Sequence, residues 1–479
     1  MYSFLISLVV LISGYFIYGR FVEKIFAPDP ARKTPAFSKA DGVDYVPLPV
    51  WKVYMIQFLN IAGTGPIFGA IMGAKFGPSS YLWIVLGCIL GGAAHDYFSG
   101  MLSLRHDGAG LPEIIRMYLG KWAGKVMLIF TILLMVLVGA VFVYSPAIIL
   151  SDLTGGSGMF IWIAVVFIYY LVATLLPIDK IIGRLYPVFA FALIFMAIAL
   201  AVCLFIKWPA IPEIWDGLGN MGAASGLIEG QAIFPYLFIT IACGAISGFH
   251  ATQSPLMARC LKNEKLGRPV FYGSMITEGI VALIWAAVGS YFFFGGGAQE
   301  LGSTLGAQAP SVVTTVSKSW LGIFGGVLAI LGVVAAPITS GDTAFRSARL
   351  MIAEAFKLEQ KSYSKRLLIA VPLFLAAGVV LWFNIADANG FNIIWRYFGW
   401  ANQSLSCFTL WAITVYLSKS RKDLAYIITL VPAAFMTSVC TTYICVDKIG
   451  LNLPQTFIPY IAGGVFVISS AIFLSLRKK

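Results

Sequence analysis

The chain interrupts its second long apolar segment with the stretch QFLNIAGTGPIFG, residues 57–69. Gly63 and Gly65 flank Thr64, and Pro66 follows without a backbone N–H, so a regular helix cannot continue here at low cost. A helix that breaks inside a bilayer frees backbone groups, which can bind a ligand near the midplane. The stretch therefore predicts a discontinuous membrane helix with a binding site at its break.

Composition places this break in a membrane protein. Of 479 residues, 59% are hydrophobic and only 11% are charged, too few charges to cover a water-soluble surface. The mean hydropathy is +0.88. These values exclude a disulfide scaffold, a disordered protein and an ordinary cytosolic enzyme. We predict an all-α polytopic membrane protein that forms a single transmembrane domain over residues 1–479.

Apolar runs of about 20 residues, the length that crosses a bilayer, recur along the whole chain. Thirteen spans are predicted, at residues 2–19, 53–76, 81–104, 124–151, 158–177, 185–206, 230–251, 269–294, 320–341, 367–384, 391–418, 424–446 and 455–476. The first is expected to be a retained extra N-terminal helix (residues 1–19), because no basic segment or cleavage pattern surrounds it.

The Lys and Arg residues behind the net charge of +12 are distributed unequally between the loops on the two sides of the membrane. With the N-terminus outside and alternating spans, 28 of the 33 Lys and Arg residues fall on the inside. The five that stay outside are Lys75, Lys207, Lys318, Arg396 and Lys448. By the positive-inside rule we predict an inner (plasma) membrane protein, N-terminus outside and C-terminus cytoplasmic, with the lipid bilayer and not nucleic acid as its partner.

A second interruption, ITIACGAISGFHATQSP at residues 239–255, lies in the seventh span. Spans 2 and 7 start on opposite sides of the membrane, so spans 2–6 and 7–11 form two five-helix groups of opposite orientation. Two inverted repeats, residues 53–206 and 230–418, each opened by a broken helix, describe a leucine-transporter-like architecture. Residues 424–476 then add two C-terminal helices. The alternative is that both glycine clusters only pack helices tightly.

The two breaks and one amide pair supply the predicted substrate-binding residues. They are Gly63, Thr64 and Gly65 in the first break, Gly244, Ser247, Gly248 and His250 at the second, and Asn402 and Gln403 in the eleventh span. Two alternatives stay open. His250 can be a structural histidine, and the two amides can bond a neighbouring helix.

Ionisable residues inside a span are costly and are usually functional or paired. His95 and Asp96, in the stretch GGAAHDYFSG at residues 91–100, and Glu278 in the eighth span are therefore predicted ion-coupling residues. Asp96 can carry a proton or pair with a cation, and His95 titrates near neutral pH. A structural pair between helices is the alternative for each.

Four oxygen-bearing side chains follow Pro337 near the end of the ninth span: Thr339, Ser340, Asp342 and Thr343. In the leucine-transporter-type fold, the corresponding helix supplies hydroxyls to a sodium site beside the first broken helix. These residues can therefore line a cation site. Alternatively, Asp342 caps a cytoplasmic helix at 343–357 and Arg346 contacts a loop.

The sequence contains no catalytic or nucleotide-binding motif. The seven cysteines are expected to be buried side chains, and no cofactor is predicted. A gradient-driven carrier that binds a small-molecule substrate and a coupling ion remains, with a channel as one alternative. The other alternative is a membrane-embedded metal-dependent enzyme or sensor. Asp96 with His95 and His250 is the only set of residues from which its metal site could be built.

Five stretches together resemble the carbon starvation protein A (CstA) family of peptide transporters. They cover residues 61–66, 91–96, 235–250, 337–349 and 398–403. The resemblance implies uptake of peptides or pyruvate across the inner membrane, with proton coupling in the pyruvate carriers.

The chain departs from the longer members of that family at one site and in its length. A His-His pair precedes the first break in those members, where this chain has Ile56 and Gln57. Proton coupling would here depend on His95, Asp96 and His250, and we favour a proton over sodium. A small carboxylate such as pyruvate is favoured over a peptide, because few carboxylates within the spans can hold an ammonium group.

Overall fold

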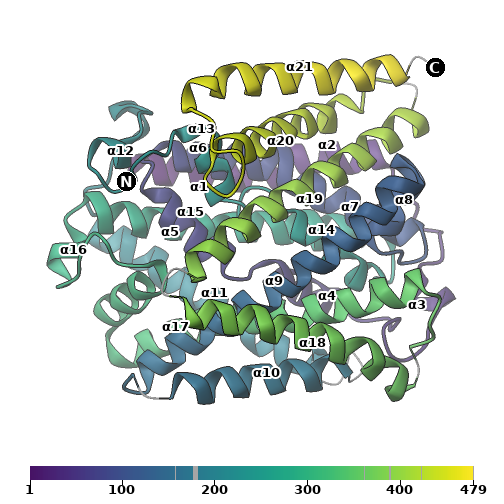
Figure 1. Ribbon diagram of the computed structural model, residues 1–479, viewed down its shortest axis with the longest axis horizontal. Coiled ribbons are helices and arrows are strands. Elements are labelled where there is room, and N and C mark those ends of the chain that lie inside the picture. Colours follow the sequence, from purple (N-terminus) through teal and green to yellow (C-terminus); the bar gives the residue numbers. More distant parts are fainter. Residues whose placement is uncertain (157, 176–181, 361, 388–389, 422, 478–479) are drawn as a thin grey trace.

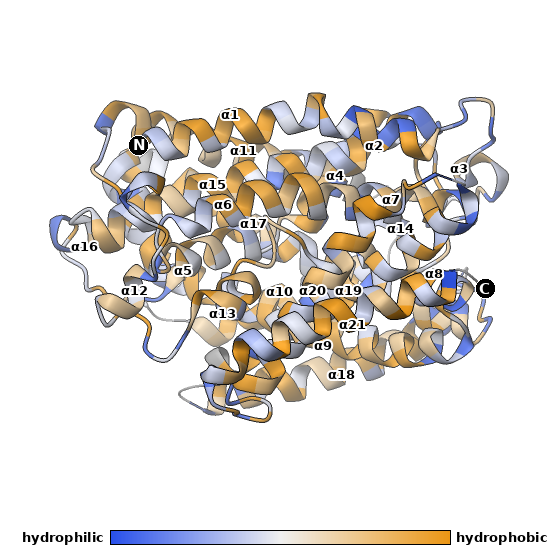
Figure 2. Ribbon diagram, turned by 90° about the horizontal axis from the view of Figure 1, so that it is seen from above, coloured by the Kyte–Doolittle hydropathy of each residue, from blue (hydrophilic) through white to orange (hydrophobic). Residues whose placement is uncertain are grey.

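The computed structural model describes residues 1–156, 158–175, 182–360, 362–387, 390–421 and 423–477, and these contain helices but no β-strand. The long helices run broadly along one direction, and the two termini lie at opposite ends of the bundle (Figure 1). Hydrophilic residues gather at those two ends and hydrophobic residues cover the middle (Figure 2). Five residues of the predicted inner basic set lie outside the described ranges: Lys180, Lys361, Lys422, Lys478 and Lys479.

The first part of the chain, up to residue 207, forms eleven α-helices. They are α1 (Tyr2–Phe16), α2 (Tyr18–Phe26), α3 (Pro35–Ser38), α4 (Val50–Ile61), α5 (Ala70–Ala74), α6 (Ser79–Leu86), α7 (Ala93–Arg105), α8 (Leu111–Leu119), α9 (Lys121–Leu153), α10 (Met159–Leu175) and α11 (Ile182–Lys207). Two wider π-helical turns, η1 (Gly65–Gly69) and η2 (Gly87–Gly92), join α5 and α7 to the segments before them.

The second part forms ten more α-helices in the described residues. They are α12 (Met221–Ala224), α13 (Ile233–Thr240), α14 (Gly248–Ala258), α15 (Gly273–Phe294), α16 (Gly297–Glu300), α17 (Ala309–Ala355), α18 (Tyr363–Ala386), α19 (Gly390–Ser420), α20 (Ile427–Val446) and α21 (Ile458–Arg477). Four short turns complete the list: η3 (Ile214–Asp216), η4 (Glu264–Leu266), η5 (Arg268–Tyr272) and η6 (Gln455–Phe457).

Each of the thirteen predicted segments falls on one helix or on a pair of helices. Among the described residues, nine helices are long and apolar enough to cross a membrane, or ten if the bent pair α4 and α5 counts as one. The short helix α10, the two halves α13 and α14, and helix α19 are not in that count. The protein is therefore a multi-pass helical membrane protein, and thirteen spans stay a prediction.

The ninth segment differs from the prediction. Helix α17 continues through Pro337 to Ala355, so the alternative of a separate helix at 343–357 capped by Asp342 is wrong. Tyrosine hydroxyls from neighbouring helices hold this part of α17. Tyr170 donates to the Pro337 carbonyl over 3.0 Å and Tyr186 donates to the Thr339 carbonyl over 2.8 Å.

Both predicted interruptions are present. Helix α4 ends at Ile61, and η1 and α5 continue at an angle of 55° to it. Helix α13 ends at Thr240 and α14 begins at Gly248 after an irregular segment. Gly244 in that segment has a φ of +91°, a conformation that side chains with a Cβ rarely adopt.

The two breaks lie against each other in the core. A Cβ atom on Gly65 would collide with the side chain of Cys243, and one on Gly69 would lie 2.8 Å from the carbonyl oxygen of Thr240. Glycine at these positions therefore allows the first interrupted helix to approach the second. The close approach brings the freed backbone groups of both breaks into one region.

Candidate functional site

Asp96 on α7 is the centre of a buried cluster beside the second break. One of its carboxylate oxygens lies 2.8 Å from Nδ1 of His95, and the other lies 2.8 Å from Nδ1 of His250 on α14. The opposite ring nitrogen of His250, Nε2, lies 3.3 Å from a carboxylate oxygen of Glu278 on α15. All four side chains are fully buried. The structure therefore brings together residues that the sequence assigned to two roles, His250 to substrate binding and the other three to ion coupling.

The net charge of this cluster depends on how many protons the four residues hold. If both carboxylates are ionised and one histidine is protonated, the site carries one negative charge, and burying such a charge without a partner is costly. Both oxygens of Glu278 lack a hydrogen bond among the described residues. The cluster can therefore accept one more positive charge, a proton or a cation.

Hydroxyl groups of α17 contact the end of the first broken helix. Ser340 donates a hydrogen bond to the carbonyl oxygen of Leu59 over 2.9 Å, and Thr339 lies 3.4 Å from the same oxygen. Thr343 donates within its own helix, to the Thr339 carbonyl over 3.1 Å. Tyr169 donates to Asp342 over 3.0 Å. The Ser340 and Thr339 hydroxyls thus approach the Leu59 carbonyl, a backbone group that the break has freed.

The amide pair on α19 supports the second break. Asn402 accepts hydrogen bonds from the backbone N–H of Phe249 over 2.7 Å and from the Ser247 hydroxyl over 3.0 Å. Gln403 donates to the carbonyl of Phe238 over 2.9 Å. One amide therefore caps the start of α14, and the other satisfies a carbonyl near the end of α13. Of the two roles considered for this pair, the structure shows the bond to a neighbouring helix.

The first break holds polar groups without partners. The hydroxyl of Thr64 and both amide atoms of Asn60 are buried and make no hydrogen bond within the described ranges. Asn60 lies in the last turn of α4 and Thr64 directly precedes η1, so the two residues flank the break. Asn60 was missed as a candidate, although an asparagine inside an apolar run just before a break is a usable signal. The two side chains are suited to hydrogen-bond a bound ligand.

Cys243, His250 and Glu278 have the spacing of a metal site. One ligand atom from each, a thiol sulfur, an imidazole nitrogen and a carboxylate oxygen, lies within 4.8 Å of the others. The sequence identified Asp96, His95 and His250 as the possible metal set and assigned Cys243 only a packing role. Three donors at this spacing can hold a divalent ion, so metal content is a quantity to measure.

The end of the bundle opposite the N-terminus is closed by buried ion pairs. Asp44, in the loop before α4, lies 3.1 Å from a guanidinium nitrogen of Arg346 and 3.7 Å from one of Arg349, both on α17. Burial raises the pKa of Asp44, but the charges of Arg349 and Arg346 outweigh it and hold the pKa below its usual value. The contact between Arg346 and a loop is therefore confirmed, and this loop is fastened to the long helix.

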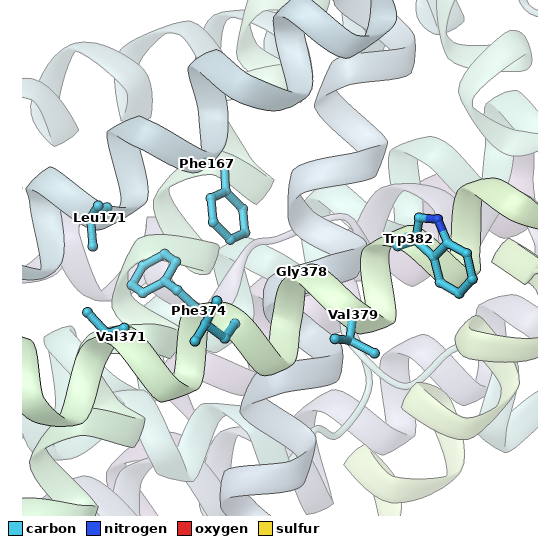
Figure 3. A pocket seen from close by; sticks show the side chains of 8 residues that line it. Phe167, Leu171, Val371, Phe374, Gly378, Val379 and Trp382 are labelled. Atoms are coloured by element: carbon cyan, nitrogen blue, oxygen red, sulfur yellow. The ribbon is translucent and has the colours of Figure 1, made fainter.

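Two cavities differ sharply in character. A groove of about 470 Å³ between α10 and α18 is lined by apolar side chains such as Phe167, Phe374 and Trp382 (Figure 3). Apart from the indole nitrogen of Trp382, its lining is apolar. A cavity of about 680 Å³ near α5, α13 and the start of α19 contains Lys75, Arg396 and other polar side chains. Only the second cavity approaches a break, because Thr240, the last residue of α13, lines it.

A family model described as "Carbon starvation protein CstA" matches residues 1–158, 148–320 and 291–443. An uncharacterized membrane protein of Haemophilus influenzae is 44% identical over 336 residues, which cover 60% of this chain and 91% of that protein.

Two named relatives come from Escherichia coli. The peptide transporter CstA is 26% identical, over 91% of this chain and 79% of that protein. The pyruvate/proton symporter BtsT is 25% identical, over 94% of this chain and 81% of that protein.

Two solved structures are similar to this one. The manganese transporter of Eremococcus coleocola superposes with a TM-score of 0.59 at 13% identity, over 91% of this chain and 98% of that one. The amino-acid-bound protein MhsT superposes with a TM-score of 0.56 at 13% identity, over 87% of this chain and 98% of that one. At this identity the likeness shows the fold alone, which is of the leucine-transporter type.

Proposed function

Because the chain belongs to the carbon starvation protein CstA family, we propose that it imports a small organic nutrient by proton-coupled alternating access. Its relatives are a peptide transporter and a pyruvate/proton symporter, and its fold is shared with transporters. It is therefore a multi-pass transporter of the inner membrane and not an enzyme. The substrate and the coupling ion are the parts proposed here.

The chain of contacts from Asp96 through His250 to Glu278 carries the proposal for the proton. It joins three helices, α7, α14 and α15, and His250 lies on the half-helix that follows the second break. Adding one proton to the ionised cluster removes its net charge. Proton occupancy therefore changes the electrostatic energy of the site next to the break, which is what coupling requires.

The α17 hydroxyls support a proton over sodium. A sodium ion beside the first break would need the carbonyl of Leu59 and the hydroxyls of Thr339 and Ser340 as ligands. Here both hydroxyls already approach that carbonyl, the Ser340 hydroxyl to within 2.9 Å. The Ser340 hydroxyl is donated to this carbonyl, and the Thr339 hydroxyl has a closer acceptor in the Ala336 carbonyl at 2.8 Å, so both hydroxyls have acceptors within the protein.

A small carboxylate is the proposed substrate. A peptide would need an acidic side chain to hold its ammonium group, but Asp96 and Glu278 both face His250. A carboxylate needs donors instead, and Asn60, Thr64 and the backbone N–H groups freed at the first break can supply them.

We also propose the finer topology: thirteen spans, N-terminus outside, C-terminus cytoplasmic, with spans 2–6 and 7–11 as inverted repeats opened by discontinuous helices. The position of the termini at opposite ends of the bundle supports an odd number of spans (Figures 1 and 2). The occurrence of a break in the second and the seventh segment supports the repeat.

Uptake into proteoliposomes tests the proposal. Labelled pyruvate and a labelled dipeptide are offered with an inward proton gradient, an inward sodium gradient or none. We expect the proton gradient alone to drive pyruvate above equilibrium, and Asp96→Asn and Glu278→Gln to abolish this accumulation. Asp152→Asn, at an exposed carboxylate near the end of α9, is the matched control.

Three results would contradict the proposal. Wild-type accumulation by both Asp96→Asn and His250→Ala would refute the coupling assignment. Flux that never exceeds equilibrium would identify a channel. Stoichiometric zinc or iron in the purified protein, lost in Cys243→Ser, would favour the metal-dependent alternative.

A further inference from the structure

Three of the five basic residues predicted on the outside line one cavity. Lys75 directly follows α5, Arg396 lies in the first turns of α19, and Lys448 lies between α20 and α21. The cavity has a volume of about 680 Å³, in the range of sites that enclose small molecules. Residues far apart in the sequence thus converge on one space.

The cavity lies at the same end of the bundle as the N-terminus. The segment between α11 and α13 lines it with Leu227, Ile228 and Gln231, and the same segment contacts the N-terminal amine through Glu213. The Asp44 ion pairs close the opposite end of the bundle. By the charge count, the cavity therefore faces the outside while the inner end is shut.

The charge of the cavity is positive. None of Lys75, Arg396 and Lys448 forms an ion pair with another described residue. One carboxylate, Asp447, shares the lining, but it is buried and accepts a hydrogen bond from the backbone of Ile449 over 3.0 Å. The ammonium group of Lys75 lies 4.7 Å from the centre of the Phe293 ring, which holds the side chain while leaving its charge unneutralised.

Residues next to both breaks line the cavity. Met72 of α5 and Thr240 of α13 line it, and each belongs to a half-helix that ends or begins at a break. A smaller neighbouring cavity of about 240 Å³ shares Met72 and Lys75 and reaches Phe68 in η1. Lys75 is therefore common to the outer space and to the space beside the first break.

We propose that Lys75, Arg396 and Lys448 form an outer vestibule that selects an anionic carboxylate before it reaches the breaks. A cleft lined by one sign of charge concentrates ions of the opposite sign and raises their rate of entry. The inference rests on the proposed carboxylate substrate, because a net-neutral dipeptide would gain little from this field. The vestibule contributes to capture, and the groups at the breaks bind the substrate for transport.

Thiol labelling tests the vestibule without any transported substrate. Ile449→Cys places a thiol in the lining, and intact cells are exposed to an anionic sulfonate or a cationic trimethylammonium methanethiosulfonate reagent. After correction for their rates with a free thiol, we expect the anionic reagent to react about tenfold faster at low salt. The protein without Ile449→Cys measures the background from its native cysteines.

Neutralisation of the vestibule is the deciding comparison. Lys75→Gln, Arg396→Gln and Lys448→Gln together should bring the two rates within about twofold of each other. Lys207→Gln with Lys318→Gln, two outer cations that do not line the cavity, should leave the preference unchanged. A preference that survives the triple substitution, or an initial preference for the cationic reagent, would overturn the proposal.

Uptake kinetics separate this proposal from the proposed function. In the triple variant we expect the KM for pyruvate to rise about tenfold and to lose its dependence on salt, while kcat changes less than twofold. An unchanged KM in the triple variant would refute the vestibule. If the wild-type protein transports no carboxylate, the proposed substrate is wrong, and the labelling ratio still decides whether the vestibule exists.

Discussion

The side chain of Asn402 on α19 accepts a hydrogen bond from the backbone N–H of Phe249, 153 residues away, over 2.7 Å. The bond caps the start of α14 immediately after the second break. The neighbouring Gln403 reaches the other half of the same broken helix. The interrupted helix is thus held on both sides of its break by one turn of α19.

Asn402→Ala should lower the melting temperature of the purified protein. The substitution leaves the Phe249 N–H and the Ser247 hydroxyl buried without an acceptor, which costs about 1–3 kcal/mol. Thermal unfolding in detergent measures the effect. Asn402→Asp keeps the accepting oxygen and should unfold closer to the wild type. Equal melting temperatures for the wild type and Asn402→Ala would contradict the capping role.

Asn60→Ala should change substrate binding and leave the melting temperature unchanged. Because its amide makes no hydrogen bond within the described part of the chain, its removal should leave the melting temperature unchanged. If the amide binds substrate, KM should rise about tenfold, which corresponds to about 1.4 kcal/mol of binding free energy. Uptake kinetics and thermal unfolding of the same preparation check both parts. A lower melting temperature with unchanged KM would assign Asn60 a structural role instead.

Gly244→Ala should destabilise the protein strongly. The residue has a φ of +91°, and an added Cβ would collide with Ala282 on α15, so both backbone strain and overpacking of about 1–3 kcal/mol follow. The control is Gly378→Ala in α18, where no atom lies within 4 Å of the added Cβ. Alanine favours a helix there, so the control should be at least as stable as the wild type. Similar melting temperatures for the two variants would argue against this geometry.

Asp44→Asn should open the inner end of the transporter. Without the carboxylate, Arg346 and Arg349 lose their shared partner, and the loop before α4 is released from α17. The buried thiol of Cys260, whose sulfur lies 3.9 Å from the Asp44 carbonyl, should then react faster with maleimide in inside-out vesicles. Asp107→Asn, which removes an exposed carboxylate paired with Lys39, is the control. Equal labelling of both variants would refute the closure.

The same labelling has an expected pH dependence. The pKa of Asp44 lies below its usual value in the folded protein, so the ion pair contributes fully above the unfolded pKa of about 4 and is lost only as the pH falls through the folded value. After correction for the pH dependence of the maleimide reaction with a free thiol, labelling of Cys260 in the wild type should therefore stay constant between pH 5 and pH 8. An increase toward pH 5 would show that another group controls the closure.

Local sequence signals predicted the helices and the breaks. Apolar runs of bilayer length identify spans, and the clusters around Gly63 and Gly244 interrupt a helix wherever they occur. The same local reasoning was wrong about a separate helix at 343–357, because Pro337 removes only a single hydrogen bond from α17. The hydroxyls of Tyr170 and Tyr186, which hold α17 there, come from other helices. A local pattern does not contain that information.

The site was only partly predictable for a related reason. His95, Asp96, His250 and Glu278 were recognisable singly, since ionisable residues inside apolar runs need an explanation. Their assembly into one cluster is a tertiary contact between α7, α14 and α15. The role of Cys243 beside that cluster depends on the same packing, and a cysteine in an apolar run has no distinguishing signal.

The shared carboxylate of Asp96 has a consequence for genetic dissection of this protein. Each of its two oxygens contacts a different imidazole. Removing His95 or His250 therefore alters the electrostatic environment of the histidine that remains. Effects of single substitutions at the two histidines should not add. An alanine scan that scores positions one at a time will misattribute their contributions, and only a double-mutant cycle through both histidines can separate them.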